Sequence, residues 1–268
     1  MTETPVPLWQ LLALNALILV AAYLLLWAIA IRLRDVSFID AWWPTGMALL
    51  AWTSMALSGG SGLHGWILAL LVTAWALRLG PHLLRRWRAH GADRRYEEML
   101  ADGQARGWSF SLSALVFVFA PQMPLQLLVA LPVQMGQVET PLGVGPLAVI
   151  GTALALFGLV FEAIGDAQLD RFKSDPANKG KVLDTGLWRY TRHPNYFGDA
   201  CLWWGLYLVA AETGLGVWSF FGPILITFLL TKGSGAPTVE KGMENRRPEY
   251  AAYIRRTSGF IPWPPRKD

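Results

Sequence analysis

Seven stretches of the sequence are apolar over the length that crosses a lipid bilayer as a helix, roughly 17–25 residues. The second stretch carries Asp40 and the sixth is short, so six or eight crossings are the alternatives to seven. The stretches are residues 9–31, 36–57, 62–80, 109–132, 142–165, 196–212 and 215–233. This pattern predicts an all-α fold, a polytopic membrane helix bundle of about seven transmembrane helices, formed as one domain over residues 1–268.

The composition agrees with a membrane protein. Of the 268 residues, 53% are hydrophobic and 16% are charged, whereas soluble domains carry about 25% charged residues. The single cysteine, Cys201, excludes an internal disulfide framework, and the four histidines lack the spacing of metal ligands. We therefore expect no metal.

Basic residues occur in alternate connections between the apolar stretches. The first, third and fifth connections and the C-terminal tail hold all lysines and arginines except Arg78, whereas SGGSGLHG, QMGQVETPLG and AETGLG hold none. Because basic loops stay on the cytoplasmic side, this pattern predicts an N-terminus outside and a C-terminus in the cytoplasm. The expected location is a bacterial inner membrane. The net charge of +4 then belongs to the inner face and is no argument for a nucleic-acid partner.

Asp40 lies about one turn into the second apolar stretch, in SFIDAWWPTGMALL. One interpretation is an interfacial acid paired with Arg34 or Arg78. The other is a site carboxylate that faces an interior cavity, since an ionisable residue inside a span is a functional hypothesis. Trp42 and Trp43 fit the wall of a site for a flat apolar ligand, and they equally fit an interfacial aromatic belt.

Two further pairs of residues share helix faces. Trp75 and Arg78 are three residues apart, and Glu162 and Asp166 are four apart. Arg78 either extends to the inner surface or pairs with Asp40 or a phosphate. The two acids repel each other unless a cation or a sugar hydroxyl holds them.

The stretch GLWRYTRHPNYFGD, residues 186–199, is polar although it adjoins an apolar stretch. Pro194 fits the first turn of a helix, whose N-terminus attracts anions. Asn195 and Asp199 then share one helix face. Arg189, Arg192 and His193 add donors around this end. The pattern predicts a site for a phosphorylated or otherwise charged cofactor at the inner face, the alternative being a basic membrane anchor with a helix cap.

These residues resemble a known signature. GLWRYTRHPNYFGD is similar to the W-G-x-x-R-H-x-N-Y-x-G-D motif of integral-membrane sterol reductases. Together with SFIDAWWP, WALRLGPHLLRR, DRRYEEM and RRPEYAAYIRRTSGFIPW, the chain resembles a bacterial member of the steroid 5α-reductase family from about residue 36 to 264. The signature-bearing part covers about residues 142–264.

The resemblance implies NADPH as the cofactor and an enone lipid, typically a 3-oxo-Δ4-steroid, as the substrate. A hydride would pass to the β-carbon of the enone. Asn195, Asp199, Asp166 and Lys173 match cofactor-binding positions of the family, and Glu162 stands where eukaryotic members have asparagine. The full expected cofactor set is Arg78, Glu162, Asp166, Lys173, Lys181, Arg189, Arg192, His193, Asn195, Tyr196 and Asp199.

On the substrate side, the resemblance places Asp40 at the position of a glutamate that addresses the steroid carbonyl. The tyrosine that usually accompanies it aligns with Trp75. Since hydride addition puts negative charge on the carbonyl oxygen, a donor aimed there stabilises the transition state. We expect a protonated Asp40 to donate, assisted by the Trp75 N–H, with Trp42 and Trp43 against the substrate.

A second function remains open from the sequence. Membrane methyltransferases of the isoprenylcysteine or phospholipid type also carry an R-H-P-x-Y element before a helix, and they use S-adenosylmethionine. The longer N-Y-F-G-D form and the acid in the second stretch favour the reductase. A lipid-binding protein without catalysis is the third interpretation. Membrane lipids are the other expected partners.

Overall fold

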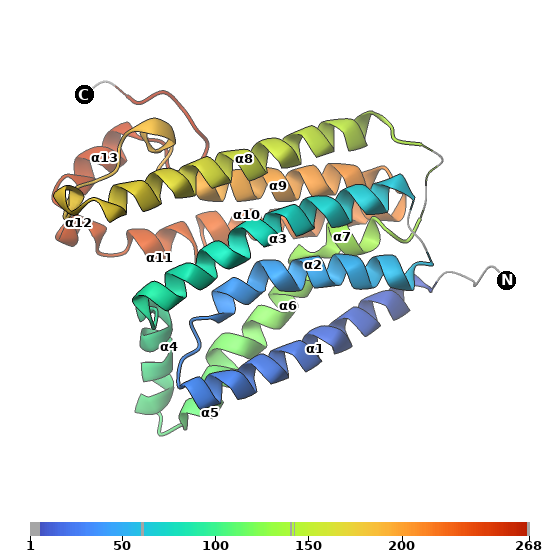
Figure 1. Cartoon of the computed structure of the whole chain (residues 1–268), viewed down its shortest axis with the longest axis horizontal. Coiled ribbons are helices and arrows are strands. Elements are labelled where there is room, and N and C mark those ends of the chain that lie inside the picture. The colour runs from blue at the N-terminus through green and yellow to red at the C-terminus, as the bar shows by residue number, and fades with distance from the viewer. Residues whose placement is uncertain (1–5, 60–61, 140, 142, 267–268) are drawn as a thin grey trace. The chain divides into compact units, whose positions relative to one another are not determined.

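Helices form from the apolar stretches that the sequence predicts. The computed structural model describes residues 6–59, 62–139, 141 and 143–266. Within these residues all regular elements are helical (Figure 1). The only extended pairing among them is an isolated bridge between Thr191 and Ser258. The expected all-α class is therefore confirmed.

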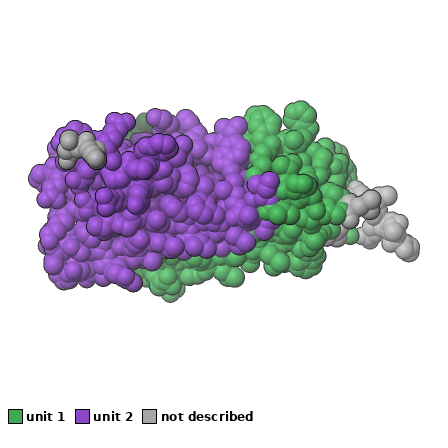
Figure 2. Space-filling model, turned by 90° about the horizontal axis from the view of Figure 1, so that it is seen from above, with its two compact units in different colours: residues 1–149, 206–222 green, residues 150–205, 223–268 purple. Residues whose placement is uncertain are grey.

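The chain forms two compact units (Figure 2). Unit 1 comprises Met1–Val149 and Leu206–Gly222, and unit 2 comprises Ile150–Gly205 and Pro223–Asp268. Three helices have residues in both units: α8 (Pro146–Ser174), α9 (Pro194–Ala211) and α10 (Phe221–Thr231). The single domain expected over residues 1–268 stays a prediction.

Unit 1 is built around two long paired helices and a buried polar cluster. Its elements are α1 (Leu8–Leu33), α2 (Ile39–Leu57), α3 (Leu63–His90), α4 (Arg94–Ala105), α5 (Phe110–Ala114), the π-helix η1 (Leu115–Phe119), α6 (Ala120–Val129), α7 (Leu131–Met135) and η4 (Leu215–Phe220). Asn15 of α1, which is fully buried, donates to Ser54 Oγ (2.8 Å) and Gln134 Oε1 (3.0 Å) and accepts from Thr53 Oγ1 (2.6 Å). These bonds join α1, α2 and α7, as polar side chains do between membrane helices.

The fourth apolar stretch is not one regular helix. The prediction for residues 109–132 assumed a single helix, but the stretch forms α5, η1, α6 and the start of α7. Pro121 and Pro124 lack the N–H groups that an unbroken helix would need, and a single-turn π segment adjusts the ladder before them. Gln122 and Gln126 lie in α6, the helix that follows the π segment.

Unit 2 contains most of α8 (Pro146–Ser174) and α9 (Pro194–Ala211), with a cap of short elements at the ends they share. The short elements are η2 (Pro176–Asn178), η3 (Gly186–Arg189), α11 (Ala236–Glu240), α12 (Met243–Arg246) and α13 (Tyr250–Arg256), and α10 (Phe221–Thr231) completes the unit. The polar stretch of residues 186–199 thus forms η3, a turn and the first turns of α9.

Among the residues that the structure describes, five helical segments are long and apolar enough to cross a membrane. They are Leu8–Leu33, Leu63–His90, Phe110–Val129, Pro146–Ser174 and Leu215–Glu240. The chain is therefore a multi-pass membrane protein. The two other expected spans are helical but shorter, since α2 has 19 residues and α9 has 18, and both contain aspartate. The count of seven and the N-out orientation stay predictions.

The orientation can be tested by cysteine accessibility in a Cys201→Ser background. Gly143 is exposed with open space at its Cβ position, and the Arg94 side chain is 79% exposed, so both positions accept cysteine. We expect Gly143→Cys to react with an impermeant maleimide added to intact spheroplasts, and Arg94→Cys to react only after lysis. Equal labelling of both variants before lysis would contradict the orientation.

Candidate functional site

Glycines bring α8 and α9 into backbone contact within unit 2. Gly158 and Gly165 of α8 are seven residues apart, as are Gly198 and Gly205 of α9. A methyl group added to Gly198 would lie 2.5 Å from the Glu162 backbone nitrogen, and one on Gly165 would lie 3.2 Å from that of Asn195. Small residues at this spacing permit the close approach of two membrane helices.

The close approach gathers four polar side chains at one interface, three of them buried and one, Asn195, partly exposed. Glu162 and Asp166 share the face of α8 that carries the glycines, and Asn195 and Asp199 share that of α9. Glu162 is 3% exposed, Asp166 7% and Asp199 9%. The Oδ1 atom of Asn195 is buried and has no hydrogen-bond partner among the described residues. The sequence predicted both shared faces, and the structure brings the four residues together as an acceptor-rich cluster, which we call the acceptor cluster.

The loop before α9 is fixed by α8 and by the C-terminal tail. Trp188 Nε1 donates to the Gly165 carbonyl (3.0 Å), and the Tyr253 hydroxyl donates to the Trp188 carbonyl (2.5 Å). Thr191 Oγ1 donates to the Phe260 carbonyl (2.8 Å), and the Arg192 N–H donates to the Ser258 carbonyl (2.9 Å). Residues 253–260 of the C-terminal tail, which belong to the segment quoted for its resemblance to the reductase family, therefore hold the N-terminus of α9 in place by hydrogen bonds.

Arg192 and His193 have an internal acidic partner. Arg192 Nε lies 2.8 Å from Glu240 Oε1, and His193 Nε2 lies 2.9 Å from the same oxygen. Tyr250 also hydrogen-bonds Glu240, and burial and this neighbouring carboxylate raise the pKa of Tyr250. The Tyr196 ring stacks on His193 with centroids 5.2 Å apart. The expected role of Arg192 and His193 toward a cofactor stays a prediction, and Glu240 is a partner that the sequence interpretation missed.

Other expected cations of unit 2 lie on its surface. Lys173, Lys181 and Arg189 are exposed. Lys173 is in the last turn of α8, where a cation is favourable, and Arg189 ends η3. Unit 2 thus combines buried hydrogen-bond acceptors with exposed cationic donors. Arg78, another residue expected to bind the cofactor, lies in α3 and belongs to unit 1.

This combination fits a nicotinamide dinucleotide. The carboxamide of a nicotinamide offers N–H donors, for which the buried carboxylates and the Asn195 Oδ1 atom are acceptors. The phosphates require cations or helix N-terminal N–H groups, which Lys173, Lys181, Arg189 and the start of α9 provide.

A separate ionic cluster surrounds Asp40 in unit 1. Asp40 Oδ2 lies 2.7 Å from Arg95 NH2 and 3.4 Å from Arg86 NH2, and Asp40 Oδ1 accepts from the Tyr96 hydroxyl at 2.5 Å. Asp93 caps α4 through the Arg95 N–H and also binds the Arg95 guanidinium (2.9 Å). Both oxygens of Asp40 accept hydrogen bonds in this cluster.

The groups around Asp40 hold defined protonation states. Burial, reinforced by the Asp40 charge and hydrogen bond, raises the pKa of Tyr96 well above its usual value, so its phenol stays protonated. Burial opposes the charge of Arg95, but the hydrogen bond to Asp93 and the charges of Asp40 and Asp93 outweigh it and raise its pKa. Tyr96 is therefore a neutral donor beside fixed cations.

These contacts change the sequence interpretation of Asp40. Arg34, one expected partner, lies over the Phe110 ring at 5.1 Å. The acid is instead held by residues of DRRYEEM, a segment quoted for its resemblance without a role. Trp75, expected as an assisting donor, is fully buried in α3.

The two expected substrate-facing tryptophans differ in their surroundings. The Trp42 Nε1 atom is buried and has no hydrogen-bond partner among the described residues. The Trp43 carbonyl accepts from Gln126 Nε2 at 2.6 Å, which joins α2 to α6. Neither observation identifies a ligand, so the substrate role of Trp42 and Trp43 stays a prediction.

Fold and site define a multi-pass helical membrane protein with an acceptor cluster in one unit and a carboxylate–tyrosine pair in the other. The model of a family described as a protein of unknown function (DUF1295) matches residues 26–257. The chain therefore belongs to this family. An uncharacterised protein of Schizosaccharomyces pombe is 23% identical over 262 residues, which cover 88% of this chain and 75% of that protein. No solved structure matches the chain.

The packing of α8 on α9 can be tested at Gly198. Gly198→Ala puts a methyl group against the backbone of Glu162 and Gly158, which side-chain motion cannot relieve. We expect the free energy of unfolding to fall by roughly 1–3 kcal/mol, as for overpacking in a close-packed interior. A lower midpoint of thermal unfolding in detergent would show this loss. Gly143→Ala is the control, because nothing lies within 4 Å of its added methyl group. Equal midpoints for the two variants would exclude the backbone contact.

Proposed function

We propose that the protein reduces the C=C bond of an enone lipid with NADPH, its substrate being of the type of a 3-oxo-Δ4-steroid reduced to the 5α-dihydro product. The observation that carries this proposal is the acceptor cluster of α8 and α9, with a buried Asn195 Oδ1 atom lacking a hydrogen-bond partner among the described residues. The resemblance of residues 186–199 to the sterol reductase signature supports the same cofactor. The proposed location is a bacterial inner membrane.

On the cofactor side, unit 2 would bind and orient the nucleotide. Asn195 and the carboxylates of Glu162, Asp166 and Asp199 would share the two N–H donors of the carboxamide and the hydroxyl donors of the ribose. Lys173, Lys181 and Arg189 would hold the phosphates. The bound nicotinamide supplies the hydride. Arg192 and His193 would act through Glu240 by keeping the N-terminus of α9 in place.

On the substrate side, Tyr96 would take the donor role that the sequence interpretation gave to Asp40 and Trp75. Its hydroxyl proton is directed at Asp40 Oδ1, and Gln122 Nε2 lies 3.4 Å from the same hydroxyl oxygen. A substrate carbonyl that replaces one of these contacts would accept the phenol proton. The nearby Arg95 would stabilise negative charge that develops on the carbonyl oxygen.

The reaction is tested by incubating the purified protein with NADPH and a 3-oxo-Δ4-steroid. We expect loss of NADPH absorbance and a product heavier by two hydrogens in mass spectrometry. A parallel incubation with S-adenosylmethionine and isoprenylcysteine or phospholipid acceptors tests the alternative. Methyl transfer without NADPH consumption would overturn the proposal.

Asn195→Ala should weaken NADPH binding. The substitution removes a buried acceptor that we assign to the cofactor, and a hydrogen bond between uncharged groups contributes about 0.5–1.5 kcal/mol, or roughly 2–10-fold in affinity. Fluorescence titration of the detergent-solubilised protein measures the change. Asn178→Ala is the matched control, because Asn178 is in unit 2 and donates to the Phe172 carbonyl. Equal affinities of both variants and the wild type would remove Asn195 from the site.

Tyr96→Phe should abolish most of the turnover while NADPH still binds. The ring and its burial are kept and only the hydroxyl is lost, and a transition-state donor is worth about 10²–10³ in turnover. Tyr23→Phe is the control, because the buried Tyr23 hydroxyl has no hydrogen-bond partner among the described residues. Wild-type turnover in Tyr96→Phe would exclude the donor role, and joint loss of folding and NADPH binding would show a structural role instead.

A further inference from the structure

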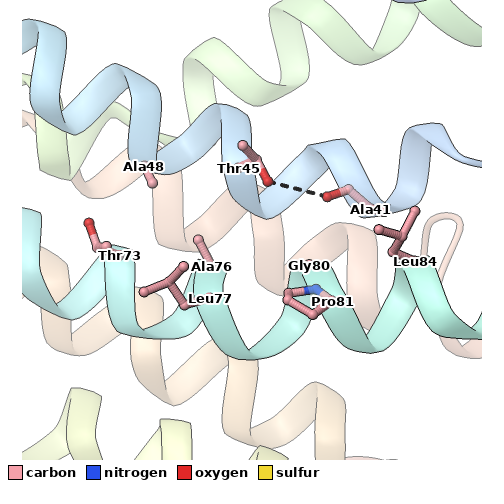
Figure 3. Close-up of a pocket in the computed structure, with 9 residues that line it drawn as sticks. All are labelled: Ala41, Thr45, Ala48, Thr73, Ala76, Leu77, Gly80, Pro81 and Leu84. Atoms are coloured by element: carbon pink, nitrogen blue, oxygen red, sulfur yellow. Dashed lines mark hydrogen bonds between the residues drawn. The ribbon is translucent and has the colours of Figure 1, made fainter.

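A groove runs along the surface of unit 1 between α2 and α3. It measures about 280 Å³ and is lined by small and apolar side chains, with Ala41, Thr45 and Ala48 from α2 facing Thr73, Ala76, Leu77, Gly80, Pro81 and Leu84 from α3 (Figure 3). Leu77 is 71% exposed, and α3 is one of the helices that can cross a membrane. The groove is therefore open at the surface of a helix that is long and apolar enough to cross a membrane.

The groove exists because the two helices meet through small residues. Gly80 lies against α2, since a methyl group added there would be 3.5 Å from the Ala41 carbonyl oxygen and from Thr45 Oγ1. Ala48 and Ala76 leave space beside this contact. From Thr73 to Leu84 the groove follows α3 over eleven residue-to-residue steps, or about 17 Å at 1.5 Å per step.

The lining face of α3 continues into two arginines. Leu77, Pro81, Leu84, Arg85 and Arg88 follow the i, i+4, i+7, i+8 and i+11 positions of one helix face. Arg85 and Arg88 are exposed. Arg86, on another face of the helix, points to Asp40 instead. One surface of α3 thus passes from an apolar groove to two exposed cations within about two turns.

We propose that this surface binds an anionic phospholipid, with one acyl chain in the α2–α3 groove and the phosphate at Arg85 and Arg88. Basic residues immediately beyond a transmembrane helix attract anionic headgroups by about 1 kcal/mol each, so two of them predict roughly a 30-fold preference over a zwitterionic lipid. The apolar groove supplies the second contact, which fixes the lipid at this place on the helix. The site is independent of the proposed reaction.

The test is a lipid titration of the delipidated full chain, followed by native mass spectrometry. The probes are phosphatidylglycerol and phosphatidylcholine with identical acyl chains, and inorganic phosphate as a competitor. The head variant is Arg85→Ala/Arg88→Ala. Its matched control is Arg32→Ala/Arg171→Ala, which removes two exposed charges from the last turns of α1 and α8. The groove variant is Ala48→Phe, whose larger side chain occupies the groove. Ala48→Leu, with a smaller side chain, replaces it if Ala48→Phe does not fold.

We expect the wild type and the control to bind phosphatidylglycerol about 30-fold more tightly than phosphatidylcholine, and the head variant to lose this preference. The groove variant should bind both lipids more weakly and keep the preference for the anionic one. Equal loss in head variant and control would show a general effect of surface charge and overturn the site. Wild-type binding by the groove variant, or displacement of the lipid by inorganic phosphate, would overturn the role of the groove.

Discussion

The backbone contact between α8 and α9 is the constraint on which the candidate cofactor site depends. Glycines on both helices remove the side chains that would separate them, and Gly198 lies directly against Glu162. The three carboxylates at this interface are buried, and the Asn195 Oδ1 atom is buried beside them. This interface therefore carries the acceptors that we assign to the N–H and O–H donors of a ligand.

Ion pairs between segments far apart in the sequence stabilise the surroundings of both sites. In unit 2, Glu240 holds Arg192 and His193 in front of α9. In unit 1, Asp40 holds Arg86 and Arg95 and thereby places Tyr96. In each case one carboxylate contacts two basic side chains, so these side chains serve first to fix the local structure. The exposed cations Lys173, Lys181 and Arg189 are then the ones that we assign to phosphate binding.

The periodicity of the sequence predicted the helices and the shared faces of Glu162 with Asp166 and of Asn195 with Asp199. Such predictions depend only on helix geometry and on the burial of apolar residues. The partners of Asp40 could not be predicted in the same way, because α4 follows a turn after α3 whose direction depends on tertiary packing. Glu240 was missed for the same reason, since a single acid in a polar tail has no periodic signal. The π segment Leu115–Phe119 was not predicted, because its five residues are all apolar and carry no sign of a changed hydrogen-bond register.

Equilibrium binding of nucleotides to the wild-type chain tests the central claim most directly, because it asks what the acceptor cluster of unit 2 recognises. Titration of the purified protein with NADPH and with S-adenosylmethionine, at equal concentrations and in the same detergent, distinguishes a nicotinamide site from a methyl-donor site. The account predicts saturable binding of one NADPH per chain and no binding of S-adenosylmethionine. Saturable binding of S-adenosylmethionine together with no binding of NADPH would contradict it.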